Sequence, residues 1–130
     1  MIFLSTNSKD FPFDEAKILY NENKKYFLPL DITFEELCNN LNGNLWATIA
    51  DNQFIGLIYF ELKQNKWFMS GCSNRKMFKY ITKAITGLCE LYFGQTDTIY
   101  SETDFKHAGE ALKRAGFKHI HSNIYRKDKK

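Results

Sequence analysis

A nearly continuous apolar stretch from Phe54 to Phe60 is the feature that most constrains the fold of this chain. The stretch has the length of a strand, and its apolar residues do not alternate with polar ones. A strand of this kind is covered on both faces, so helices are expected on either side of its sheet. Asp51-Asn52-Gln53 is typical of a turn, which predicts a hairpin joining strands Leu45–Ala50 and Phe54–Glu61.

The remaining pattern predicts alternating helices and strands around this hairpin. Strands are expected at Met1–Leu4, Trp67–Cys72, Thr98–Ser101 and Phe117–Tyr125. Helices are expected after Pro12, after the capping box Thr33-Phe34-Glu35-Glu36, at Arg75–Phe93, and around an apolar stripe formed by Ala108, Ala111, Leu112 and Ala115. The order β, α, α, β, β, β, α, β, α, β predicts a mixed α/β fold in one domain, residues 1–130, with helices on both faces of the sheet.

The expected helix Arg75–Phe93 begins in a basic environment. Ser73 or Asn74 can cap its start, and Gly94 suits a left-handed residue just past its end. Between Glu61 and Glu90 the sequence has no acid, and its bases are Lys63, Lys66, Arg75, Lys76, Lys79 and Lys83. Because a helix start also carries a partial positive charge, this region is predicted to attract an anion such as phosphate.

The overall charge argues against a nucleic-acid partner. The chain has 18 bases and 15 acids, but four of the bases and one of the acids lie at positions 126–130. The other residues therefore hold 14 bases and 14 acids, which cancel. We interpret residues 126–130 as a flexible basic tail that is not needed for folding.

The cysteines and the apolar stretches indicate a cytoplasmic protein. Cys38, Cys72 and Cys89 are widely spaced and lack the pairing expected of a zinc site, so no metal is expected. Free thiols agree with a reducing compartment. The sequence shows no secretory signal and no stretch long enough to cross a membrane.

The order of elements and the end of the last helix resemble the GNAT superfamily of acyl-CoA N-acyltransferases. The segment from Ala108 to Gly116-Phe117 looks like the family's last helix and the Gly-Phe step that opens its final strand. Arg75 matches the opening basic residue of the family's phosphate loop, Gln/Arg-x-x-Gly-x-Gly/Ala. Phe78 and Tyr80 stand where that loop has small residues, so the loop is degenerate in this chain.

The resemblance implies acetyl-CoA as co-substrate. In the family, the strand before the phosphate helix bulges and parts from its parallel neighbour, and the CoA arm pairs with the exposed backbone. The matching residues of this sequence are Met69, Gly71, Cys72, Ser73, Asn74, Arg75, Lys76, Phe78 and Lys79.

The resemblance also suggests catalytic candidates. Family members often use a strand Glu as base and a Tyr in the last helix as acid, but Leu112 occupies that Tyr position here. Acyl transfer to an amine needs a base for the amine and a proton for the leaving thiolate. The candidates for base are Glu61 and Glu102, and the candidate for acid is Tyr100.

Three interpretations of function follow. The first is an N-acyltransferase that acts on the amine of a small molecule or a protein. The second is a GNAT-shaped chain that has lost catalysis and serves as an interaction or assembly component, as in divergent phage proteins. The third is a nucleic-acid-binding module that uses the basic helix start and the basic tail. A homodimer or another assembly partner is left open.

Overall fold

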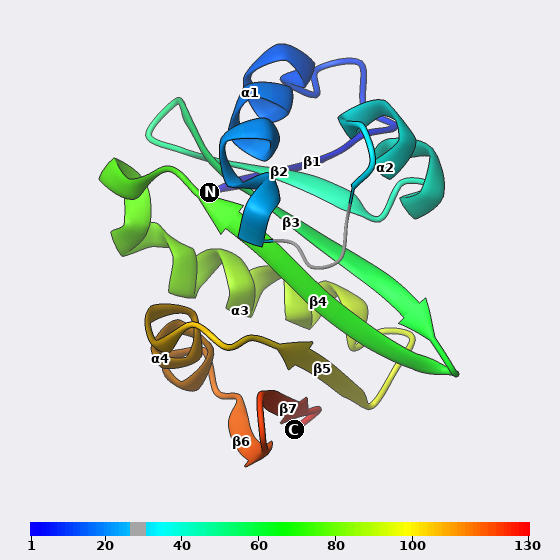
Figure 1. The fold of residues 1–130 in the computed structure, drawn as a ribbon, viewed down its shortest axis with the longest axis vertical. Coiled ribbons are helices and arrows are strands. Elements are labelled where there is room, and N and C mark those ends of the chain that lie inside the picture. The colour runs from blue at the N-terminus through cyan, green and yellow to red at the C-terminus, as the bar shows by residue number, and fades with distance from the viewer. Residues whose placement is uncertain (27–30) are drawn as a thin grey trace. The chain divides into compact units, whose positions relative to one another are not determined.

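A computed structural model describes residues 1–26 and 31–130 of the chain (Figure 1). Its strands are β1 (Ile2–Ser5), β2 (Leu45–Ala50), β3 (Gln53–Lys63), β4 (Lys66–Ser73), β5 (Thr98–Glu102), β6 (Lys118–His121) and β7 (Ile124–Asp128). Its helices are α1 (Phe13–Asn23), α2 (Phe34–Leu41), α3 (Ile81–Tyr92) and α4 (Lys106–Arg114), with short 3-10 helices η1 (Lys24–Tyr26) and η2 (Arg75–Tyr80). The strand order β1-β2-β3-β4-β5-β7-β6, with β4 and β5 parallel, confirms the mixed α/β class.

The apolar stretch forms an interior strand, as its pattern predicts. β3 lies between β2 and β4 in the sheet, and its residues are buried from Ile55 to Phe60. The turn before it places Asp51 and Asn52 at φ of 53° and 63°, the left-handed geometry that suits a tight two-residue hairpin. Among the described residues, no helix is long and apolar enough to span a membrane.

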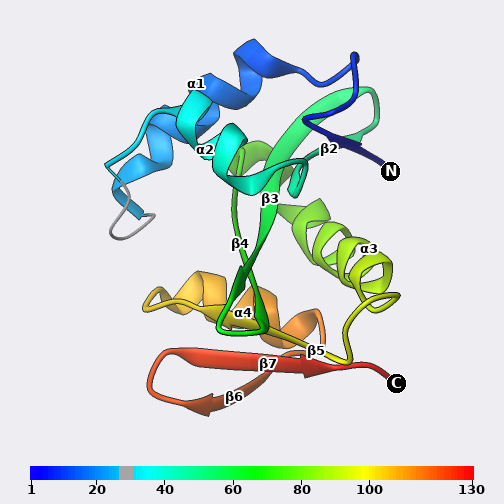
Figure 2. The ribbon, with the colours of Figure 1, turned by 90° about the vertical axis from the view of Figure 1, so that its right-hand side faces the viewer.

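The chain divides into two compact units, residues 1–59 with 71–78 (unit 1) and residues 60–70 with 79–130 (unit 2). In unit 1, α1 and α2 lie on the same side of β1–β3 (Figure 2). Their buried side chains, including Tyr20 and Phe34 with ring centroids 5.6 Å apart, pack on alternate residues of the strands. These strand residues are Leu45, Ala47, Leu57 and Tyr59. The expectation of a single domain, residues 1–130, stays a prediction.

Unit 2 has its own core, built where α3 and α4 meet the strands. Tyr92 of α3 stacks on Phe60 with ring centroids 3.7 Å apart and meets Trp67 edge-on at 5.4 Å. Gly109 of α4 lies so close to the Tyr125 hydroxyl that a methyl group there would overlap it. A bare helix surface therefore lets α4 approach β7 closely.

The capping box at the start of α2 is present as the sequence predicts. The Glu36 amide donates to Thr33 Oγ1 at 3.1 Å, and the Thr33 amide donates to Glu36 Oε1 at 3.2 Å. Both bonds satisfy amides that the helix itself leaves without an acceptor.

We therefore expect Thr33→Ala to lower the free energy of unfolding by about 1 kcal/mol. The measurement is urea denaturation followed by circular dichroism. Thr33→Ser keeps the hydroxyl and should unfold within a few tenths of a kcal/mol of the parent. An equal loss in both variants would show that the hydroxyl is not what stabilises this helix start.

The helix predicted from Arg75 begins later than expected. Residues Arg75–Tyr80 form the 3-10 helix η2, and the α-helix starts at Ile81 with Tyr80 as its N-cap and no side-chain cap. The expected caps Ser73 and Asn74 are thus wrong, because a 3-10 segment separates them from the α-helix. Gly94 does not adopt the expected left-handed conformation either, since α3 ends in right-handed geometry at Phe93.

The C-terminal region also differs from its prediction. The expected single strand Phe117–Tyr125 is a hairpin, in which β6 and β7 are joined through Ser122 at φ 47°. Residues 126–128, expected to belong to a flexible tail, pair instead with β5 as part of β7. Lys127 is only 7% exposed, and its Nζ donates to the backbone oxygen of Ala115 at 2.7 Å. Charge composition could not predict this pairing, because it does not show that one of the lysines is buried at the end of α4, where it caps the helix.

Candidate functional site

The parallel pairing of β4 with β5 stops before β4 ends. The register pairs Trp67 with Ile99, Phe68 with Tyr100 and Met69 with Ser101. At this last pair the Ser101 hydroxyl donates to the backbone oxygen of Met69 at 2.8 Å, and the bond is buried. β4 continues to Ser73 beyond the recorded pairing with β5. The pairing of the two strands thus ends at Met69 and Ser101, and the parting of the strands stays a prediction.

Gly71, which the sequence predicts at a bulge near a ligand, is needed for contact with β3. A Cβ on Gly71 would lie 2.5 Å from the backbone oxygen of Leu57, and one on Gly56 would lie 2.6 Å from that of Cys72. The two glycines thus let neighbouring backbones approach more closely than side chains allow. Gly71 lies within the predicted strand, and a side chain at this position would collide with β3.

The other predicted residues of β4 differ in their surroundings. Met69 is buried, Ser73 is half-buried, and burial raises the pKa of the Cys72 thiol to about 12. The raised pKa favours the protonated Cys72 thiol at neutral pH. Burial likewise raises the pKa of Cys38 to about 11 and that of Cys89 to about 12. Among the residues that the structure describes, no group of side chains is arranged to hold a metal ion.

The predicted anion-binding segment follows β4 directly in the chain. The Asn74 amide donates to the backbone oxygen of Ile55 at 2.9 Å, which anchors the segment to β3. Arg75 and Lys79 in η2 are exposed, and Lys79 Nζ lies 5.0 Å from the centre of the Tyr80 ring. The side chains of Lys76 and Phe78 lie outside the described part of the structure. Two accessible cations therefore precede the first turn of α3.

Tyr100 and Glu102, a predicted acid and a predicted base, lie on β5. Tyr100 is half-buried, with its ring centre 5.5 Å from that of Phe68 and 5.3 Å from Lys66 Nζ. Glu102 is exposed at the end of the strand, and its Oε1 accepts a hydrogen bond from Asn123 Nδ2 at 3.4 Å. Glu102 is the residue after Ser101, so it lies one position past the last pair of β5 with β4.

Glu61, the other predicted base, is an exposed carboxylate on β3. Its Oε1 lies 3.6 Å from Lys63 Nζ, and both side chains are about half exposed. The residue is far along β3, two positions before its end at Lys63. The Glu61 carboxylate is therefore engaged by Lys63 at a solvent-exposed position.

The sequence analysis missed Ser101, whose hydroxyl closes the strand pairing. The sequence pattern could have indicated it, because Ser101 is a polar residue two positions after Ile99 and so lies on the same face of a short strand. A polar residue on the buried side of a strand requires a partner. Here the partner is the backbone oxygen of Met69.

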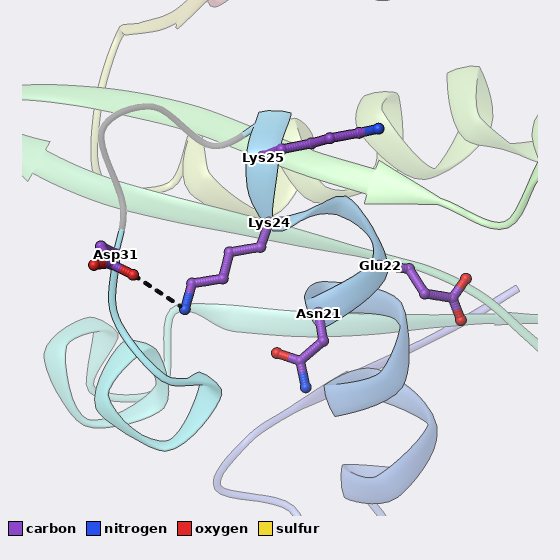
Figure 3. A pocket seen from close by; sticks show the side chains of 5 residues that line it. All are labelled: Asn21, Glu22, Lys24, Lys25 and Asp31. Carbon is purple, nitrogen blue, oxygen red and sulfur yellow. Dashed lines mark ion pairs between the residues drawn. The ribbon is translucent and has the colours of Figure 1, made fainter.

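A shallow hollow of about 480 Å³ lies elsewhere in unit 1 and contains none of the predicted site residues. It is lined by Asn21, Glu22, Lys24, Lys25 and Asp31. Figure 3 shows Lys24 pointing toward Asp31, with its Nζ 3.7 Å from the Asp31 carboxylate, whereas Lys25 and Glu22 extend away from this pair. The lining carries both charges in equal number and presents no feature of an enzyme site.

Comparisons with known proteins relate the chain to solved acetyltransferases by structure. No protein-family model matches the sequence, and no curated protein matches it. The aminoglycoside acetyltransferase AAC(6')-Ib in complex with coenzyme A and kanamycin superposes with a TM-score of 0.75 at 12% identity, covering 97% of this chain and 93% of that chain.

Two further structures give the same result. An N-acetyltransferase from Staphylococcus aureus Mu50 has a TM-score of 0.72 at 10% identity and covers 98% of both chains. An acetyltransferase of the GNAT family from Bacillus anthracis has a TM-score of 0.64 at 18% identity, covering 86% of this chain and 85% of that chain. The fold implied by the sequence resemblance is confirmed: the chain has the fold of the GNAT acetyltransferases.

Proposed function

We propose that the chain is an N-acyltransferase that transfers an acetyl or related acyl group from acyl-CoA to an amine. The observation that carries the proposal is the end of β4–β5 pairing at Met69 and Ser101, with β4 running on to Ser73 in a chain of GNAT fold. Backbone groups of β4 beyond Met69 are then available to an extended ligand, which can pair with them as another strand would.

The residues that follow β4 fit the anionic half of such a ligand. Arg75 and Lys79 are exposed cations of η2, the segment that leads into α3, and the amides and dipole at a helix start favour phosphate. Neither cation forms an ion pair among the described residues, so neither has to leave a carboxylate in order to bind. We infer that these side chains replace the small-residue cradle that the loop lacks, at the cost of ordering two long side chains.

We assign the proton transfers of the reaction to two residues at the end of β5. Bound acyl-CoA supplies a thioester whose carbonyl carbon is attacked by the acceptor amine. The Glu102 carboxylate is exposed and suited to accept the proton of that amine, either directly or through water. Tyr100 is the remaining candidate for returning a proton to the thiolate. Glu61 is the weaker candidate for the base because Lys63 engages it.

Acyl-CoA binding should depend on the two cations of η2. We expect Arg75→Ala with Lys79→Ala to weaken the binding of desulfo-CoA by about a hundredfold or more, since each charge-assisted phosphate contact is worth roughly 1.5–3 kcal/mol. Isothermal titration calorimetry on the full chain measures this effect, and raising the salt concentration should shrink the difference.

Lys113→Ala with Arg114→Ala is the matched control, because it removes the same two charges from the exposed end of α4. This control should bind desulfo-CoA as the parent does. Equal weakening in both doubles would mean that only net charge matters, and unchanged binding in the η2 double would place the ligand elsewhere. Failure of the parent to bind acetyl-CoA at millimolar concentration would contradict the proposed function.

The acceptor is proposed only as an amine. Structures with the same fold include one described with kanamycin and one described as a spermidine N-acetyltransferase. A panel of aminoglycosides, polyamines and lysine peptides, with release of the CoA thiol as readout, tests the class. A chain that binds acetyl-CoA but releases no thiol with any amine would support binding and contradict transfer.

A further inference from the structure

The turn between β6 and β7 lies beside Glu102, the residue to which the proposed function assigns the base. β7 pairs with β5 along one edge and with β6 along the other (Figure 2). The last register pair of β5 joins Glu102 to Ile124, the first residue of β7. Asn123, the residue before Ile124, therefore stands next to the end of β5.

Asn123 bonds to this end of β5 through both its backbone and its side chain. Its backbone oxygen accepts from the Thr103 amide at 2.9 Å, and its Nδ2 donates to Glu102 Oε1 at 3.4 Å. The backbone bond extends the pairing of β5 with β7 by one step, so it fixes where the Asn123 side chain begins. The side-chain bond is long and exposed, so it steers the carboxylate without burying it.

The geometry of the turn does not itself require an asparagine at position 123. Asparagine is common in turns because it tolerates a positive φ. Here the positive φ, 47°, belongs to Ser122, and Asn123 does not have one. The turn is held on its other side by His119, whose Nε2 lies 2.5 Å from the Ser122 backbone oxygen. The recorded side-chain bond of Asn123 goes to Glu102 and not to the turn.

A hydrogen bond to Glu102 limits the positions that its carboxylate can take. An exposed glutamate rotates about several bonds, whereas a general base has to stay within hydrogen-bond reach of the proton that it removes. The Asn123 amide engages Oε1 and leaves Oε2 available to the acceptor amine. Because this amide is neutral, it orients the carboxylate without the ion pair that engages Glu61.

We propose that Asn123 is a positioning residue, which holds the Glu102 carboxylate in the orientation that accepts the proton of the acceptor amine. This inference rests on the proposed function, and in particular on Glu102 as the base. The role of Asn123 is exerted through Glu102 and not through contact with acyl-CoA. Loss of its amide should therefore lower kcat and leave the binding of acyl-CoA unchanged.

Steady-state kinetics of the full chain test the proposal, with acetyl-CoA and the amine of the panel that is acetylated fastest. Asn123→Ala should lower kcat by about tenfold, since a small misplacement of a catalytic group can cost up to about a hundredfold. The dissociation constant of desulfo-CoA should stay within about twofold. Asn123→Asp replaces the donor by a second carboxylate and should lower kcat at least as much. Asn123→Gln keeps an amide donor and should recover part of the rate.

A double-mutant cycle separates positioning from a loss of structure. Glu102→Ala removes the base and should lower kcat by about a hundredfold or more. Adding Asn123→Ala to Glu102→Ala should lower kcat by no more than about a further twofold, because the group that Asn123 orients is already gone. Ser122→Ala is the control within the same turn, since the recorded bond of Ser122 is made by its backbone oxygen, and it should keep kcat within about twofold of the parent.

Several outcomes would overturn the proposal. They are a parent-like kcat in Asn123→Ala, a tenfold loss that recurs in the Glu102→Ala background, and an equal loss in Ser122→Ala. A measurement independent of activity is the side-chain amide resonance of Asn123 in nitrogen-15 NMR spectra, which should move in Glu102→Ala; an unmoved resonance also overturns the proposal.

Failure of this inference is distinguishable from failure of the proposed function. If Glu102→Ala transfers the acyl group as fast as the parent, Asn123 has no base to position, but the chain is still an acyltransferase. A parent that transfers no acyl group to any amine contradicts the proposed function and the inference together.

Discussion

Gly71→Ala is expected to destabilise the fold by about 2–3 kcal/mol, although Gly71 itself lies at an exposed position. The added methyl group would stand 2.5 Å from the backbone oxygen of Leu57 and 3.2 Å from a side-chain carbon of Ile58. A backbone oxygen inside a sheet cannot move aside without breaking strand pairing. The loss should therefore be much larger than the few tenths of a kcal/mol usual for an exposed position.

Gly94→Ala is the matched control for this prediction. Its added methyl group would meet only the backbone oxygen of Leu91 at 3.4 Å, an ordinary contact, and Gly94 does not have a positive φ. Its stability should stay within about 0.5 kcal/mol of the parent, or rise slightly because alanine restricts the unfolded chain. Thermal and urea unfolding of both variants measure the difference, and equal stabilities would show that β3 and β4 do not need this glycine.

Lys127→Met is expected to lower the free energy of unfolding by about 1–3 kcal/mol. The substitution keeps an unbranched side chain of similar length beside Gly116 but removes the donor to the Ala115 oxygen, which accepts at 2.7 Å. A buried carbonyl is then left without this partner at the end of α4, where a positive charge is also favourable. The measurement is urea denaturation at constant pH and salt.

Lys129→Met separates this effect from a general loss of positive charge. Lys129 is exposed, and its recorded bond, from its backbone amide to the Asp97 oxygen at 2.8 Å, survives the substitution. The variant should unfold close to the parent. Removing residues 127–130 altogether should cost more than Lys127→Met, because two register pairs of β7 with β5 are lost as well. A truncated chain as stable as the parent would restore the interpretation of a dispensable tail.

Much of the fold could be predicted because local chemistry and tertiary packing agree there. The run from Phe54 to Phe60 is interior, the box Thr33–Glu36 caps α2, and Gly116 has the left-handed φ of 97° that ends α4. In each case the residue type itself indicates the local requirement: burial, capping of a helix, or a left-handed backbone. Gly94 looked equivalent to Gly116, but α3 ends in right-handed geometry without using its freedom.

The candidate site was less predictable because its features depend on partners distant in the chain. Lys127 is buried with its Nζ bonded to the Ala115 oxygen, and the Ser101 hydroxyl is bonded to the oxygen of Met69, 32 residues away. Helical periodicity also extended through residues 75–80, where the chain forms a 3-10 helix that preserves the apolar spacing only approximately. Glu61, Tyr100 and Glu102 stay predictions as catalytic residues.

The strand order β5-β7-β6 has a consequence for the chain while it is being synthesised. β6 is made before β7 but pairs with β7, which itself pairs with β5. Until Ile124–Asp128 has emerged from the ribosome, β6 has no strand to join and the edge of β5 stays open. An unpaired edge is a template for pairing with other chains. Chains that end before Ile124 should therefore aggregate more readily than the full chain, because this edge of β5 stays unpaired.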